Sequence, residues 1–151
     1  MRAVIEVCGD DVKFFKPVPD ENPEGHTIWA FEPRQEVFED LFLKSKKFPN
    51  YHVVNKAVSS TTGEGQVRLE DFVNEFKIER IDLLHVSTNK GVEVLESLGS
   101  HMTIVASGVM KVPYKELADP IEFLIKNGFQ VYSMKPQDPE CKEVLISFYR
   151  P

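Results

Sequence analysis

Polar residues that can do chemistry gather at the end of one apolar segment in the middle of the chain. Residues 81–86 have the length and the apolar content of a strand that is buried on both faces. Ser87, Thr88 and Asn89 follow this segment, and His85 lies within it. Hydroxyl and amide groups can orient a ligand by hydrogen bonds, and an imidazole can act as a general base near neutral pH.

The same residues have structural interpretations, which the sequence leaves open. A histidine that alternates with apolar residues on a central strand, as His85 does, is more often a satisfied core residue than a base. Ser87, Thr88 and Asn89 can equally satisfy the first amide groups of a helix that follows them.

Such a helix is predicted directly after the turn. Val92, Val94, Leu95 and Leu98 recur at helical spacing, and Gly99 stands where a C-cap glycine would. In an open α/β sheet, ligands bind beyond the carboxyl ends of the strands. The strand, turn and helix therefore predict where the site lies.

Strands and helices alternate through the rest of the chain, which predicts a mostly parallel α/β sheet. The other strands are expected at residues 3–8, 27–31, 51–58 and 102–106. Helices are expected from Pro33 to about Lys46, at residues 69–76, and after an N-cap at Asp119. The chain then closes on residues 129–134 and 144–149, whose short connection suits an antiparallel hairpin.

Composition limits the class of protein. The 151 residues, 42% hydrophobic and 28% charged, suit a single soluble domain over residues 1–151. No apolar run has membrane-spanning length and the N-terminus does not resemble a signal peptide, so we expect an intracellular, cytoplasmic protein without membrane contact.

Charge and metal-ligand spacing exclude two further classes of function. A net charge of -6 argues against a surface that follows nucleic-acid phosphates. Two cysteines cannot form a disulfide scaffold, and Cys8 is expected in the core. His26, His52 and His101 are scattered without partner spacing, so no metal site is expected.

Several short motifs occur in an order that is informative as a set. They are Phe-Glu-Pro at 31–33, Asn-Lys-Ala-Val-Ser at 55–59, Leu-Glu-Asp-Phe at 69–72, Ile-Asp-Leu-Leu at 81–84 followed by Gly91, and Lys-Asn-Gly-Phe at 126–129. From about Val4 to the C-terminus the chain resembles the FkbM-type S-adenosylmethionine-dependent methyltransferases. The resemblance implies a Rossmann-like class I methyltransferase fold, in which a final antiparallel strand inserts into a parallel sheet.

The resemblance also implies a cofactor, S-adenosylmethionine, and residues that would hold it. Glu6 and Gly9 correspond to the family's acid and glycine-rich turn after the first strand. Glu32 stands where such folds place the acid that accepts hydrogen bonds from ribose hydroxyls, although it can also be an acid stabilised by a helix N-terminus. The other implied contacts to the cofactor come from Ser87, Asn89 and Ser107.

The sequence departs from the family where the chemistry should be. Only Gly9 remains of the glycine-rich turn, and Asp10 and Asp11 after it would repel the methionine carboxylate. Pro17, Pro19 and Pro23 make a long helix improbable in the following segment, which predicts that the first helix is lost.

The central strand departs as well. His85, Ser87 and Asn89 stand where the family has a lysine followed by acids, and Ser107 stands where it often has a glutamate.

Two functions remain open from the sequence. The first, which we favour, is a degenerate methyltransferase fold that acts as a non-catalytic binding or assembly module. The second is an active S-adenosylmethionine-dependent O-methyltransferase that acts on a small molecule or a sugar, with His85 taking the proton from the acceptor hydroxyl.

A surface for a protein partner or for self-association is predicted from the lost helix. Its absence would leave one flank of the sheet short of cover, near Phe14, Phe15 and Trp29. Trp29 taken alone is most simply a core residue.

Overall fold

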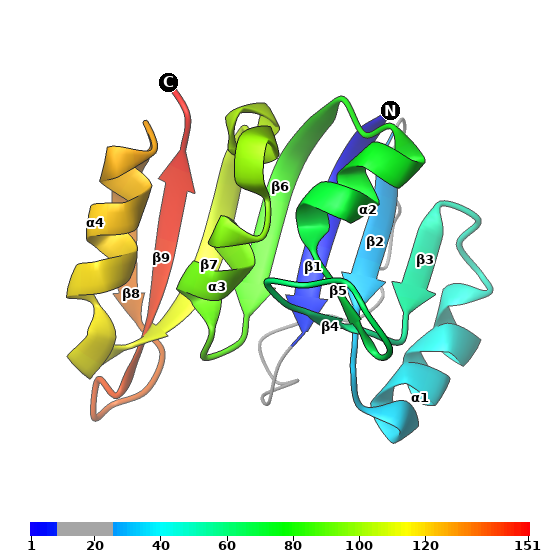
Figure 1. The fold of residues 1–151 in the computed structure, drawn as a ribbon. Helices are drawn as coiled ribbons and strands as arrows, with labels where there is room; N and C mark the ends of the chain where they lie inside the picture. Colours follow the sequence, from blue (N-terminus) through cyan, green and yellow to red (C-terminus); the bar gives the residue numbers. More distant parts are fainter. Residues whose placement is uncertain (9–25) are drawn as a thin grey trace.

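A seven-stranded sheet organises the molecule (Figure 1). The computed structural model describes residues 1–8 and 26–151. The strand order is β3-β2-β1-β6-β7-β9-β8, and β9 runs antiparallel to both of its neighbours while the other pairs are parallel. The strands are β1 (Arg2–Cys8), β2 (Thr27–Phe31), β3 (Tyr51–Val54), β6 (Arg80–Ser87), β7 (Ser107–Pro113), β8 (Gln130–Pro136) and β9 (Glu143–Tyr149). The predicted mostly parallel sheet with a C-terminal antiparallel hairpin is therefore confirmed.

Helices cover one face of this sheet (Figure 1). Figure 1 shows α2 (Leu69–Phe76), α3 (Gly91–Glu96) and α4 (Ala118–Lys126) in front of the strands, and α1 (Gln35–Ser45) near the end of β3. Two 3-10 helices, Gly99–Ile104 and Tyr114–Glu116, flank β7. A small second sheet pairs β4 (Ala57–Val58) with β5 (Gln66–Val67).

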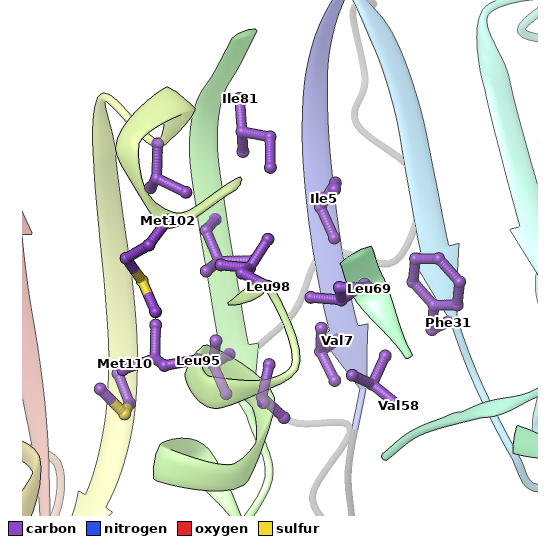
Figure 2. Packing of buried hydrophobic residues seen from close by; sticks show 14 of the residues in the cluster. Ile5, Val7, Phe31, Val58, Leu69, Ile81, Leu95, Leu98, Met102 and Met110 are labelled. Atoms are coloured by element: carbon purple, nitrogen blue, oxygen red, sulfur yellow. The ribbon is translucent and has the colours of Figure 1, made fainter. Parts of the chain in front are cut away.

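The main core lies between the sheet and these helices (Figure 2). Alternate residues of each strand point to this face because the side-chain period of a strand is two. Ile5 and Val7 of β1 meet Leu69 of α2, and Leu95 and Leu98 lie over β6 (Figure 2). Trp29 is a core residue as predicted, with its ring stacked on His52 and against Phe72 and Phe76.

The opposite face has a smaller apolar cluster and carries two titratable residues. Ile28, Ala30 and Tyr51 form that cluster, with Val4, Phe48 and Val53 partly buried against it. Glu6 of β1 and His85 of β6 are directly registered partners in the sheet. Both are half-buried and alternate with the core residues of their strands, so both lie on this face.

The predicted fifth strand at residues 102–106 is wrong. This segment is the 3-10 helix Gly99–Ile104, and the strand begins only at Ser107. A short apolar run does not distinguish a strand from a helical turn, since Met102 and Val105 reach the same core from the turn. Gly99, with a φ of 53°, starts this turn.

Several element ends also differ from the prediction. The helix expected from Pro33, α1, begins at Gln35. α4 begins at Ala118, so Asp119 lies inside its first turn and is not the N-cap. Residues 51–58 do not form one strand, because Val58 pairs with β5 in the second sheet. Gly9, Phe14, Phe15 and the segment in which a helix was expected to be lost lie outside the described residues.

Within the described part of the chain, no helix combines the length and apolarity needed to cross a membrane. The same residues hold no cluster of three or more histidine, cysteine or acidic side chains that could bind a metal ion.

Candidate functional site

The carboxyl ends of β1, β2 and β6 surround a pocket of about 350 Å³. This volume falls in the range of small-molecule sites, roughly 300–1,000 Å³. Its position agrees with the expectation that ligands bind beyond the carboxyl ends of parallel strands. It is lined by Val7, Cys8, Pro33, Arg34, Ala57, Val58, Ser59, Gln66, Thr88, Asn89, Lys90 and Glu93.

Glu32, the predicted ribose acid, lies directly after β2 beside this pocket but has no exposed surface. One of its carboxylate oxygens accepts hydrogen bonds from the backbone N–H and the Nε of Arg34, at 2.9 and 2.8 Å. The other accepts from Nη2 of Arg34 at 3.1 Å. A carboxylate offers about four acceptor positions, so Arg34 takes most of them.

Arg34 stands between Glu32 and the pocket. Its side chain is 36% exposed and lines the pocket, whereas Glu32 does not line it. A ribose diol could reach the Glu32 carboxylate only if the guanidinium of Arg34 moved away from it. Glu32 therefore lies directly after β2 as expected, with most of its acceptor positions already bonded to Arg34.

Asn89 lies at the meeting point of three pockets. Besides the first, it lines a pocket of about 160 Å³ with Ser87, Lys111 and Glu143, and one of about 390 Å³ that extends toward the start of α4. Thr88 supports this turn, since its Oγ1 accepts a hydrogen bond from the backbone N–H of Lys90 at 3.3 Å. The predicted turn residues are thus at the edge where a ligand would bind.

Cys8 ends β1 and contributes to the pocket wall. It is buried at 6% exposure. Burial, together with the negative charges of Glu6 and Glu32, raises the pKa of its thiol to about 12. A thiol that stays protonated is a poor nucleophile, so Cys8 acts as a small core residue, as predicted.

Glu6 faces away from the pocket. Its carboxylate accepts a hydrogen bond from the Tyr51 hydroxyl at 3.0 Å on the far face of the sheet. Burial raises the pKa of Glu6 to about 7, although the Tyr51 hydrogen bond opposes this. Glu6 is absent from the walls of the three pockets that meet at Asn89.

His85 shares this far face with Glu6. Burial lowers its pKa to about 4, so the ring is neutral at physiological pH. It lines none of the three pockets at the carboxyl edge. The structure therefore separates the predicted base from the pocket that could hold a cofactor.

Ser107 lies at the amino end of its strand, away from the carboxyl ends where the pockets lie. It is the first residue of β7, and its hydroxyl donates to the backbone carbonyl of Asp82 at 2.6 Å. Its expected place at the end of a strand depended on the incorrect strand at residues 102–106. Ser107 is thus not brought together with Ser87 and Asn89.

Sequence reasoning missed Arg34 and Lys90 as pocket residues. Arg34 had one available signal, because an arginine two residues after an acid can fold back onto it. Lys90, which follows Asn89 in the turn, lines two of the pockets.

Known proteins resemble this chain in structure and not in sequence. No protein-family model and no curated protein matches the chain. An rRNA methylase from Streptococcus thermophilus superposes with a TM-score of 0.63 at 12% identity, over 99% of this chain and 86% of that one. The fibrillarin pre-rRNA processing protein of Methanococcus jannaschii gives 0.59 at 13% identity, over 83% and 56%.

A third solved structure is a complex with a cofactor product. TrmK of M. capricolum, bound to S-adenosylhomocysteine, gives a TM-score of 0.56 at 12% identity, over 82% of this chain and 51% of that one. The chain spans little more than half of TrmK and of fibrillarin. Together with the strand order, these likenesses identify the architecture: the chain has the Rossmann-like fold of class I S-adenosylmethionine-dependent methyltransferases.

Proposed function

We propose that this chain is a degenerate methyltransferase-fold protein of FkbM-type ancestry that acts as a non-catalytic binding or assembly module. The observation that carries the proposal is the pairing of Glu32 with Arg34. The acid that would accept the ribose hydroxyls of S-adenosylmethionine is fully buried and bound to a guanidinium of its own chain.

Energetics favour the closed arrangement over cofactor binding. Separating a buried ion pair costs about 3 to 5 kcal/mol, because a charge is left buried without its partner. Hydrogen bonds from neutral ribose hydroxyls to Glu32 would recover only part of this free energy. A net loss of about 4 kcal/mol corresponds to roughly thousandfold weaker binding, which changes a micromolar dissociation constant into a millimolar one.

Two other features support the absence of catalysis. His85 lies on the far face of the sheet from the pocket, so no described histidine is placed to deprotonate an acceptor held there. Ser87 and Asn89, where the family has acids, are neutral.

The active alternative, an S-adenosylmethionine-dependent O-methyltransferase for a small molecule or sugar, has one observation in its favour. The 350 Å³ pocket lies at the carboxyl edge of the sheet, and TrmK, which shares the fold, is a complex with S-adenosylhomocysteine. Under this alternative Arg34 swings out and Glu32 accepts the ribose.

As a binding module, the chain would act through a protein partner or a second copy. The surface near Phe14 and Phe15 remains a proposal, since both lie outside the described residues. Trp29 contributes little to such a surface, because it is only 8% exposed.

Calorimetry with S-adenosylmethionine and S-adenosylhomocysteine tests the proposal. The unaltered protein is expected to give no binding heat with ligand at about 1 mM, which corresponds to a binding free energy weaker than about -4 kcal/mol. Micromolar binding that is lost in the Glu32→Gln variant would overturn the proposal and support the active alternative. The matched control is Glu143→Gln, which changes an acid next to Asn89 outside the proposed ribose position.

A further inference from the structure

An apolar row on α4 begins at the core and ends in an exposed isoleucine. Leu117, Ile121 and Ile125 recur every four residues, so they form one row along the helix. Leu117 and Ile121 are partly buried, but Ile125 is 61% exposed. The row therefore continues from the core to the surface of α4.

A groove runs beside this row. Ala118, Glu122 and Lys126 form the neighbouring row of the same helix, and the two rows line an open groove of about 730 Å³. Rows of side chains four apart are the ridges that interlock when two helices pack, and the small Ala118 leaves space for an incoming ridge. The surface of α4 therefore has the shape that a second helix needs.

The charges on the groove indicate which helix would fit. Glu122 and Lys126 are both exposed and lie one helical turn apart. In an antiparallel pair of identical helices related by a two-fold axis at the level of Leu124, Glu122 of each copy faces Lys126 of the other. The same axis places Ile125 of each copy level with residue 123 of the other, midway between Ile121 and Ile125 in the apolar row. A two-fold interface requires such self-complementarity of one patch with itself.

We infer that this chain forms a two-fold symmetric dimer in which α4 packs antiparallel against α4 of a second copy. The register is set by the charges, because moving the axis to the level of Glu122 would oppose the Glu122 carboxylates of the two copies. Ridge-into-groove packing of these rows implies a crossing angle of about 50°.

The neighbouring strand supports this edge as the interface. β8 is the last strand of the sheet, and α4 lies at the same end of the molecule (Figure 1). Tyr132 and Met134 of β8 are 64% and 55% exposed. Met134 pairs with the core residue Ile146, so it lies on the same face as α4 and a dimer through α4 would shield it, whereas Tyr132 packs on Tyr149 on the other face.

α1 provides a contrasting surface and a control. Leu43 is 63% exposed, close to the 61% of Ile125, and the neighbouring Phe42 is 46% exposed with the Lys46 ammonium 5.4 Å from its ring centroid. Leu43 also lies outside the groove on α4. The Leu43→Arg variant therefore matches Ile125→Arg in exposure and in chemistry.

Sedimentation equilibrium of the full chain tests the inference. We expect a dimer at about 100 µM, since small interfaces give micromolar dissociation constants. Ile125→Arg should give a monomer with an unchanged circular dichroism spectrum, whereas Leu43→Arg should remain dimeric. A monomer of unaltered protein at this concentration would overturn the inference, as would a dimer that survives Ile125→Arg.

Charge reversal tests the antiparallel register. Glu122→Lys places lysines opposite lysines, and Lys126→Glu places glutamates opposite glutamates, so each variant alone should dimerise about tenfold more weakly. A mixture of the two variants should form a mixed dimer, because each lysine then faces a glutamate. Equal association in the mixture and in the separate variants would contradict this register. The outcome is independent of whether the pocket at the carboxyl edge binds a cofactor.

Discussion

The guanidinium of Arg34 holds both carboxylate oxygens of Glu32, with Nε 2.8 Å from one oxygen and Nη2 3.1 Å from the other. This two-pronged geometry is the strong form of an ion pair. It is formed at a point where a methyltransferase fold would offer its acid to a ribose. The same ion pair therefore contributes to the stability of the fold and blocks the acid that a ribose would need.

The first prediction concerns the stability that this pair provides. Arg34→Met should lower the free energy of unfolding by about 3 kcal/mol at pH 7, because it leaves the Glu32 carboxylate buried without its partner. Urea denaturation followed by circular dichroism would measure this change.

Arg80→Met is the matched control for Arg34→Met. Arg80 also pairs with an acid two residues later, its Nε lying 2.6 Å from Asp82. Asp82 keeps the guanidinium of Arg2 and the ring of His26 as partners, so the loss there should be below about 1 kcal/mol. Equal losses in the two variants would show that Glu32 does not depend on Arg34.

The second prediction is that Glu6 and His85 oppose each other in the pH dependence of stability. The pKa of Glu6 is raised from 4.5 to about 7, so the folded protein retains a proton there that the unfolded chain releases. Its contribution to the free energy of unfolding falls as the pH rises through this interval. The pKa of His85 is lowered from 6.5 to about 4, so its contribution is lost as the pH falls from 6.5 toward 4.

Single substitutions should separate the two effects. Glu6→Gln should leave a stability that rises with pH between 4 and 6.5, by about 1 to 3 kcal/mol. His85→Asn should leave one that falls between pH 4.5 and 7 by a similar amount. Denaturation midpoints measured across this range check both, and parallel pH profiles for the two variants would refute the account.

The third prediction concerns two glycines at close contacts. A Cβ at Gly108 would lie 2.2 Å from Cζ of Phe148 and 2.8 Å from the backbone oxygen of Leu84, neither of which can move away easily. Gly108→Ala should therefore destabilise the protein by about 3 kcal/mol or more.

Gly91→Ala is the comparison for Gly108→Ala. A Cβ at Gly91 meets mainly the sulfur of Met110, at 2.4 Å, and a methionine side chain can change its rotamer. The gain in helix propensity at the start of α3 offsets part of the remaining strain, so we expect a loss below about 1.5 kcal/mol. A larger loss for Gly91→Ala than for Gly108→Ala in thermal denaturation would contradict this ranking.

The sequence was informative where a period persisted over a whole element. The strand at residues 81–86 and the helix at 69–76 were predicted correctly. In each, apolar residues recur at the spacing of one type of element over the whole segment. The run at 102–106 was too short for its period to be recognised. β7 alternates buried and half-buried residues from Ser107 to Pro113, but Ser107 and Gly108 were taken as the end of the strand expected at residues 102–106, so this pattern was not recognised.

The sequence located the ends of the strands at the candidate site but not the hydrogen bonds that the side chains make there. Ser87, Asn89 and Glu32 were placed at the correct edge because strand ends can be located from their punctuation. The occupation of Glu32 by Arg34 depends on a side-chain rotamer, which periodicity does not specify. His85 was recognised as a titratable residue on the central strand, but its face depends on the bulge between Ala3 and Val4 that shifts the register of β1 and β6.

The most direct test of the account follows the Arg34 side chain itself during a titration with S-adenosylhomocysteine. The Nε–H signal of Arg34 in an NMR spectrum reports its hydrogen bond to Glu32, and Arg80 provides the reference signal within the same sample. The account predicts that the Arg34 signal keeps its position up to about 1 mM ligand, because the guanidinium stays on Glu32. A shift of the Arg34 signal that saturates at micromolar ligand, while that of Arg80 remains in place, would show that the acid is released for a ribose and would contradict the central claim.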